Sequence, residues 1–543
     1  MRSPAPRALL ATASVAVALA AADTYVVVLA LPDMMTGVGL GIDALQRATP
    51  IISGFLLGYV AVLPLIGRLA DLVARQRILV ACLAVFIVGS AITALAVELP
   101  VLVTGRILQG VGGGGLVPAT LALVADLWPG GRRGTALGVV GAVQELGSVL
   151  GPVLGAAVLA VSGWRAIFWL NVAVAVVLTG VLLALGMPRR RRPRGIPLAV
   201  GGLAAAVSLL ALVAPARLAT DVTLGVPFVP FGGSSSRVFT PIGVAALVLV
   251  ALWLALVAPR SWPLLRRADL PGAALLGLAL GSVILTFAAS DPERDVVGPA
   301  GWALLPLGAV ALGLYLWRHR TAEQPLVARG VVRGRARAAL AVSLLAGAAL
   351  VAVVVDVPVL ARLTYTSSQT VAALVLVRFL VAVPIGALLG GWSLRRLGDG
   401  VVSGGGLALA SSGLWAMGHW GAGSLASPTA TVVLVAVGLG VGLAVAPVNN
   451  AALASAPDTA HATASALVVV ARMVGMVVGL ALLTALGLHR YYLTVAALPD
   501  QTDTRALVAA GVVQVQTVFT GAAVAALLGA LASVGLGLRR VVS

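Results

Sequence analysis

Long apolar runs recur along the whole chain and constrain its fold more than any other feature. A helix needs about 20 apolar residues to cross the hydrocarbon of a bilayer. Runs of that kind lie near 9–31, 48–67, 77–97, 101–125, 134–160, 164–187, 197–215, 240–258, 270–289, 301–317, 338–361, 371–393, 401–418, 429–453, 462–488 and 513–538. The sequence therefore predicts an all-α polytopic membrane protein with about 16 transmembrane segments.

The composition supports lipid as the main solvent. Hydrophobic residues make up 60% of the chain and charged residues only 10%, whereas soluble domains carry about a quarter charged residues. The net charge of +18 comes from basic residues that are all Arg. These Arg residues lie between the apolar runs and form no single basic face, so we interpret the excess as compositional bias and expect no nucleic-acid partner.

Most Arg residues fall in every second loop, as in the run from Arg189 to Arg192. Loops on the cytoplasmic side of a membrane carry an excess of basic residues. This alternation predicts an even number of spans, with both termini cytoplasmic.

The runs are grouped as six, four and six. Duplicated halves with a binding site between them are common in transporters. We expect an N-terminal six-helix bundle (1–188), inserted linker helices (189–337) and a C-terminal six-helix bundle (338–543). An internal echo supports the duplication, because the loop at 67–71 has a counterpart at 390–398.

Three local strings resemble motifs of the major facilitator superfamily, in its drug:proton antiporter branch with fourteen helices. They are Gly67-Arg68-Leu69-Ala70-Asp71, Arg106-Ile107-Leu108-Gln109-Gly110 and Gly147-Ser148-Val149-Leu150-Gly151-Pro152-Val153-Leu154-Gly155. The first string departs from the family pattern just beyond its end, at Leu72 and Ala74. The third resembles a motif of exporters, which importers generally lack. The resemblance implies the major facilitator fold and proton-driven transport without a bound cofactor or metal.

A narrower resemblance links the chain to mycobacterial lipid and drug exporters. It is carried by Asp23-Thr24-Tyr25-Val26-Val27-Val28, Gln144-Glu145-Leu146-Gly147-Ser148 and Ala471-Arg472-Met473-Val474-Gly475-Met476. It implies a bacterial inner-membrane location, export of triacylglycerides or other apolar or amphipathic molecules, and a periplasmic lipoprotein partner. The exporters have two linker helices, which 270–289 and 301–317 match. The pair 197–215 and 240–258 is additional.

Ionisable residues inside the apolar runs are candidates for proton coupling, because each costs about 2.5–3.5 kcal/mol on insertion. Burial disfavours a charged carboxyl group and a nearby cation favours it, so a balanced carboxylate can load and release a proton. We expect Asp23 and Glu145 to carry the proton, with Arg472 as counter-charge. The resemblance to the second family motif implies that Arg106 takes part in proton transfer. The alternatives are a static salt bridge, helix packing by Arg472 and orientation of backbone carbonyls by Arg106.

Asp356 and Arg378 lie at similar depths in consecutive antiparallel runs. At 1.5 Å per residue both are about 8–11 Å inside the membrane. We expect an intramembrane ion pair with a structural role, and a role in substrate or proton binding is the alternative.

Two glycine-containing motifs are expected to control conformational change. The family resemblance implies a lock at the cytoplasmic face, formed by Gly67, Asp71 and Arg75, that holds the outward-open state and breaks on switching. The alternative is that these residues only keep the loop soluble. The exporter motif offers Gly147, Gly151 and Gly155 on one helix face, with Pro152 able to free a carbonyl. This exporter motif is expected to prevent leakage through the transporter. The alternative is that it only allows close helix packing.

The run from 461 to 498 has no strong helix breaker. As one helix it would be about 57 Å long, which exceeds a hydrocarbon thickness of about 30 Å. We expect it to project outward with the last helix and to guide cargo or dock a partner. An importer of the same fold is the nearer alternative function. A membrane enzyme is disfavoured, because the four His residues are isolated and no catalytic cluster is visible.

Overall fold

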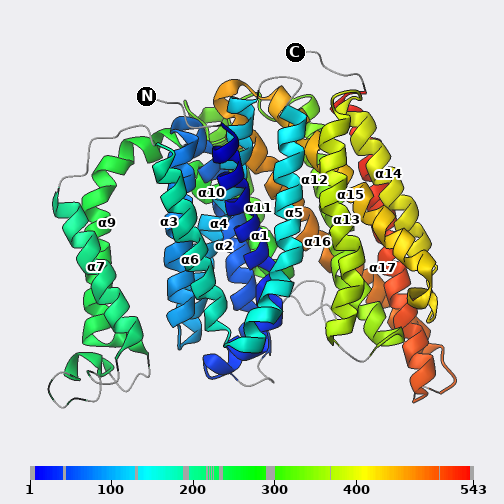
Figure 1. Cartoon of the computed structure of the whole chain (residues 1–543), viewed down its shortest axis with the longest axis horizontal. Coiled ribbons are helices and arrows are strands. Elements are labelled where there is room, and N and C mark those ends of the chain that lie inside the picture. The colour runs from blue at the N-terminus through cyan, green and yellow to red at the C-terminus, as the bar shows by residue number, and fades with distance from the viewer. Residues whose placement is uncertain are drawn as a thin grey trace.

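The chain forms helices that run across one common layer in a computed structural model (Figure 1). The structure describes residues 6–40, 45–128, 133–186, 195–215, 218, 221, 223, 225–231, 236–288, 300–366, 369–500 and 502–538. Within these residues, 16 helices are long and apolar enough to cross a membrane. This confirms the predicted all-α fold class and makes the chain a multi-pass membrane protein.

Two six-helix bundles stand side by side (Figure 1). The N-terminal bundle comprises α1 (Pro6–Gly37), α2 (Leu45–Leu72), α3 (Arg75–Leu95), α4 (Leu99–Leu127), α5 (Arg133–Val161) and α6 (Arg165–Ala184). The C-terminal bundle comprises α12 (Arg335–Thr364), α13 (Gln369–Ser393), α14 (Asp399–Met417), α15 (Pro428–Ser455), α16 (His461–Ala496) and α17 (Thr504–Ala532). The first helix begins and the last helix ends at the same face of the layer, which we call the terminal face (Figure 1).

Four inserted helices lie between the bundles in sequence: α7 (Gly195–Val213), α9 (Pro241–Arg267), α10 (Leu270–Ala288) and α11 (Gly301–Thr321). α10 packs against α2 of one bundle and α16 of the other. The α7–α9 pair stands apart at the edge of the molecule (Figure 1). α9 continues to Arg267, beyond the predicted end at 258, through Pro259 and Pro263. Hydropathy marks where apolar side chains stop, and a helix can continue past that point.

The inserted α10–α11 pair is held by a buried carboxylate. Asp269 accepts hydrogen bonds from Arg318 Nε at 2.7 Å, Leu326 N at 3.0 Å and Gly272 N at 3.2 Å. Because Asp269 is only 2% exposed, these donors balance the cost of removing its charge from water. This tie joins the start of α10, the end of α11 and the segment that leads to α12.

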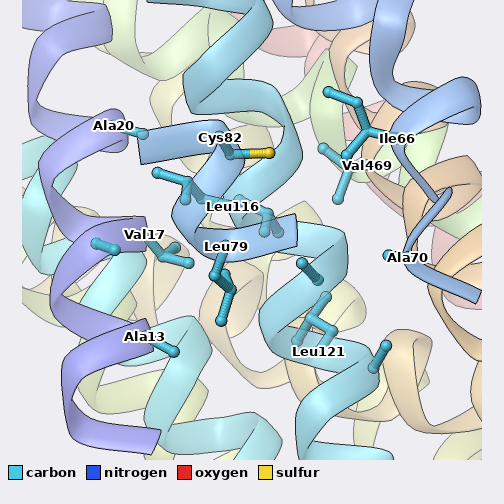
Figure 2. Close-up of a cluster of buried hydrophobic side chains, with 14 of the residues drawn as sticks. Ala13, Val17, Ala20, Ile66, Ala70, Leu79, Cys82, Leu116, Leu121 and Val469 are labelled. Atoms are coloured by element: carbon cyan, nitrogen blue, oxygen red, sulfur yellow. The ribbon is translucent and has the colours of Figure 1, made fainter. Parts of the chain in front are cut away.

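The largest buried cluster crosses from one bundle to the other. It contains Leu79 and Cys82 of the N-terminal bundle together with Ala466 and Val469 of α16. Figure 2 shows Val469 among residues of the N-terminal bundle. Cys82 is a small buried side chain within this cluster. A shared apolar cluster of this kind holds the two bundles together.

Small residues let the bundles approach closely along two seams. At the α2–α16 seam, a Cβ added to Gly67 would lie 2.8 Å from Ala466 Cβ. At the α5–α13 seam, a Cβ added to Gly138 would lie 3.0 Å from Gly391 Cα. Both contacts are closer than ordinary packing distances, so the fold depends on glycine at these positions.

α16 is a single helix of 36 residues. At 1.5 Å per residue it is about 54 Å long, well beyond a hydrocarbon thickness of about 30 Å. With the start of α17 it reaches past the neighbouring helices of its bundle at the face opposite the terminal face (Figure 1).

Candidate functional site

A buried polar network surrounds Asp23 in the N-terminal bundle. Arg106 Nη1 donates to Asp23 Oδ2 at 2.6 Å, and the two residues are 1% and 0% exposed. Asn171 Nδ2 donates to Asp23 Oδ1 at 2.5 Å, and Gln109 Nε2 approaches the same oxygen at 3.3 Å. Charge-assisted bonds of this kind stabilise a carboxylate that has been removed from water.

Arg106 is itself held in a fixed position. Its Nη1 also donates to Gln109 Oε1 at 2.9 Å, and its Nε donates to the carbonyl of Ile51 at 3.3 Å. Gln109 in turn donates to Ser90 at 2.9 Å. The network thus joins α1, α2, α3, α4 and α6, and it lies wholly inside one bundle.

Sequence reasoning did not single out Asn171 or Ser90. Each is a lone uncharged polar residue in an apolar run, and such residues give a weaker signal than a charge. The described network shows that Asn171 is nevertheless a direct partner of Asp23.

Glu145 and Arg472 form a second ion pair, which connects the two bundles. Arg472 Nη2 of α16 donates to Glu145 Oε1 of α5 at 2.6 Å. The side chains are 18% and 7% exposed. The sequence predicts that Asp23 and Glu145 act as one proton-coupling pair. In the structure each carboxylate forms its own ion pair, Asp23 with Arg106 and Glu145 with Arg472.

A central cavity of about 190 Å³ lies between the bundles. Both bundles line it, with Arg472 in its wall. Its residues are Val17, Ala21, Thr24, Ile52, Phe55, Leu56, Tyr59, Val117, Gln144, Ser148, Val351, Arg472, Met473, Met476, Val477 and Leu480. A smaller adjoining cavity of about 50 Å³ shares Arg472, Gln144, Val117 and Met473 with it. The wall is mainly apolar, and its polar groups are Thr24, Tyr59, Gln144, Ser148 and Arg472.

Asp71 connects the bundles at the terminal face. It accepts hydrogen bonds from the backbone N–H groups of Ala462 and Thr463, both at 2.9 Å, and from Thr463 Oγ1 at 2.6 Å. Free N–H groups and the helix dipole make the N-terminus of α16 a favourable place for a carboxylate. Arg75 lies 3.4 Å from Asp71 and 3.4 Å from Asp126.

The glycines of the exporter-like motif face α1. A Cβ added to Gly147 would lie 2.7 Å from Ala18 Cα, and one added to Gly151 would lie 3.0 Å from Ala22 Cα. Gly155 faces Val26, where an added Cβ would lie 2.5 Å from a side-chain methyl carbon. Pro152 lies within α5, which stays helical from Arg133 to Val161. The motif therefore brings the backbones of α1 and α5 into contact.

The expected ion pair between Asp356 and Arg378 does not form in this structure. Arg378 Nη1 donates to Thr431 Oγ1 of α15 at 3.0 Å. Asp356 is 4% exposed, and its Oδ2 has no hydrogen-bond partner among the described residues. Equal depth fixes the height of a residue along a helix but leaves open which face of the helix it occupies. Asp356 sits between Val353 and Val357, which are both core residues.

Known proteins resemble the chain along most of its length. The profile of the major facilitator superfamily matches residues 13–480. A triacylglyceride transporter of Mycobacteroides abscessus is 37% identical over 492 residues, which cover 88% of this chain and 82% of that protein. A triacylglyceride transporter of Mycobacterium tuberculosis is 34% identical over 501 residues, which cover 89% and 83%.

Solved structures share the fold at low sequence identity. A proton:xylose symporter of the major facilitator superfamily aligns with a TM-score of 0.58 at 13% identity, covering 98% of this chain and 95% of that chain. A fucose:proton symporter from E. coli aligns with a TM-score of 0.51 at 12% identity, covering 97% and 99%. Together, the profile match, the relatives and the two-bundle architecture establish that the chain belongs to the major facilitator superfamily.

Proposed function

We propose that this transporter exports apolar lipids of the triacylglyceride class, and apolar drugs, from a bacterial inner membrane by proton-coupled alternating access. The mycobacterial relatives named triacylglyceride transporters support the lipid class. The mainly apolar central cavity fits such a cargo. The Arg bias supports a cytoplasmic terminal face, so the opposite face is the periplasmic one.

The observation that carries proton coupling is the Glu145–Arg472 pair. It joins α5 to α16 across the two bundles at 2.6 Å, and Arg472 lines the cavity. Protonation of Glu145 removes one of two paired charges and releases Arg472. Because a single proton then changes a contact between the bundles, it can bias which face of the protein is open.

The Asp71 contact provides the second half of the cycle. It holds α2 to the start of α16 at the terminal face. We infer that this contact, with Gly67 packed beside it and Arg75 next to it, keeps the cytoplasmic face closed while the cavity faces outward. When the Asp71 contact breaks, the units 1–188 and 338–543 can rotate relative to each other about the central cavity. The inserted segment 189–337 moves with them.

Asp23 is proposed as the second proton carrier, with Arg106 as its partner. The Gly147–Gly155 motif then seals α1 against α5 beside it. The protruding ends of α16 and α17 form a surface on the periplasmic side, where a lipoprotein acceptor would take the cargo (Figure 1).

The test uses purified protein in liposomes that contain a fluorescent triacylglyceride. Transfer to acceptor vesicles is measured with and without an imposed pH gradient. We expect the gradient to accelerate transfer by the wild type and to have no effect on Glu145→Gln or Asp23→Asn. The matched control is Asp269→Asn, which removes another buried Arg-paired carboxylate away from the bundle interface. Gradient-driven transfer that is unchanged in both Glu145→Gln and Asp23→Asn contradicts the proposal.

A further inference from the structure

Phe55 lies between the central cavity and the buried Asp23 network. On one side it lines the cavity. On the other side, the guanidinium carbon of Arg106 lies 4.5 Å from the centroid of its ring. An arginine stacked at this distance on an aromatic face is held by a cation–π attraction. One ring therefore contacts both the space for cargo and the partner of Asp23.

Neither Asp23 nor Arg106 is among the described residues that line the central cavity. The cavity wall does contain polar groups, including Tyr59, Gln144 and Arg472. A cavity with several polar groups can hold water, whereas an apolar one stays dry. The ring of Phe55 belongs to the wall of this cavity and contacts Arg106, so it covers part of the Asp23–Arg106 pair on the cavity side.

The other side of Asp23 offers no comparable route. A second cavity of about 190 Å³ lies between α1, α5 and α6, and among the described residues that line it Asp23 and Asn171 are the polar ones. Its rim includes Leu150, Leu154 and Leu170, which are among the exposed large hydrophobic residues. In a membrane such a rim faces acyl chains, so this cavity opens toward lipid and not toward either aqueous compartment.

We propose that Phe55 is the gate through which cargo controls proton exchange at Asp23. The inference rests on the proposed proton-coupled function. Apolar cargo in the cavity packs on the free face of the ring and holds it against Arg106. When the cavity empties, the ring rotates away and a proton moves from cavity water to the Asp23 carboxylate. Arg106 keeps its charge and its bonds to Gln109 and to the carbonyl of Ile51.

The central cavity of about 190 Å³, which Phe55 lines, is the space into which the ring would turn. Gly113 of α4 lies next to the tip of the ring, and a Cβ added there would lie 3.8 Å from Phe55 Cζ, an ordinary contact distance. Phe55 is thus a positioning residue, because it acts on Asp23 through Arg106 and through the access of water.

The test measures proton leak in liposomes that contain triacylglyceride as cargo and enclose a pH-sensitive dye, after an imposed pH jump; the cargo holds the wild-type ring against Arg106. We expect Phe55→Leu to raise the leak severalfold over the wild type. The matched control is Phe86→Leu, a fully buried phenylalanine of the same core cluster that lines neither cavity; its leak should equal that of the wild type. If Phe55→Leu does not purify as a monodisperse protein, Phe55→Met, which is similar in volume and has no ring, takes its place.

Adding Asp23→Asn to the Phe55 variant identifies the route of the proton. We expect the double variant to lose the leak, because the proton passes through the Asp23 carboxylate. A folded Phe55 variant without a leak, or a leak that persists in the double variant, overturns the inference. Either result leaves the proposed function intact if Asp23→Asn alone still abolishes gradient-driven lipid transfer. If Asp23→Asn and Glu145→Gln both retain that transfer, the proposed function fails, whatever the leak of the Phe55 variants.

Discussion

Asp71 and Thr463 are hydrogen-bonded across the two bundles, with both the backbone N–H and the hydroxyl of Thr463 donating to Asp71 Oδ2, at 2.9 and 2.6 Å. The carboxylate of α2 thus serves as the N-terminal cap of α16, a role that a residue of the same helix usually fills. Opening of the terminal face must remove this cap, so closure of the face and stability of the start of α16 are linked.

Replacing the cap should loosen the terminal face. We expect Asp71→Ala to cost about 1 kcal/mol, which corresponds to about a fivefold rise in local opening. Hydrogen–deuterium exchange of the segment 461–470 measures it. Asp126→Ala is the control, because Asp126 also lies 3.4 Å from Arg75 and makes no hydrogen bond to α16 among the described residues. Equal exchange in the two variants would contradict the prediction.

The Glu145–Arg472 pair should reveal itself in a double-mutant cycle. Arg472→Gln leaves Glu145 unpaired in a largely buried position, so we expect a loss of about 3–5 kcal/mol in stability. Glu145→Gln in the Arg472→Gln background should recover part of that loss, because no uncompensated charge remains. Thermal unfolding in detergent measures the four proteins. Simple addition of the two single effects would refute the coupling.

Backbone contact between α1 and α5 should make Gly151 intolerant of a side chain. We expect Gly151→Ala to destabilise the protein by about 1–3 kcal/mol, since an added Cβ would lie 3.0 Å from Ala22 Cα and overpacking has costs of that size. Gly180→Ala of α6 is the control, because nothing lies within 4 Å of its added Cβ. Thermal unfolding compares them, and equal stability of both variants would show that α1 and α5 have room to separate.

The buried carboxylate of Asp356 should lower stability rather than support it. Its Oδ2 has no hydrogen-bond partner among the described residues, and an uncompensated buried polar group carries a desolvation cost of about 1–3 kcal/mol. We expect Asp356→Leu to leave thermal stability unchanged or higher, and Asp356→Asn with Arg378→Gln to behave as the sum of the single changes. If Asp356→Leu strongly destabilised the protein and neutralising Arg378 recovered the stability, the predicted Asp356–Arg378 ion pair would be supported instead.

The sequence predicted the spans well because hydropathy is a local property. Every apolar run corresponds to a helix, even where Pro interrupts it, as in α4 and α5, because lipid leaves the backbone no other partners than its own. The charges were also conspicuous, since a charged residue in an apolar run stands out against its neighbours. Asn171 and Ser90 did not stand out, so one donor to Asp23 and the acceptor that holds Gln109 escaped notice.

The pairing of those charges could not be read from the chain. Helix rise gives the depth of Asp356 and Arg378, but the rotation of each helix about its own axis decides whether two side chains meet. Arg378 turns toward Thr431, and the pair is lost. Conversely, Asp71 meets Thr463 although 392 positions separate them. The end of α2 and the start of α16 lie together at the terminal face.

By itself, the amino-acid sequence determined that the chain crosses a membrane many times, because apolar length and charge placement act residue by residue; the division into two six-helix bundles with an insertion was a prediction from the grouping of the runs. Only the tertiary structure decided which carboxylate faces which arginine, that Phe55 both lines the central cavity and stacks on Arg106, and that Asp71 caps a helix of the other bundle. These relations depend on how helices rotate and approach one another, and close packing sets both only when all the helices are in place.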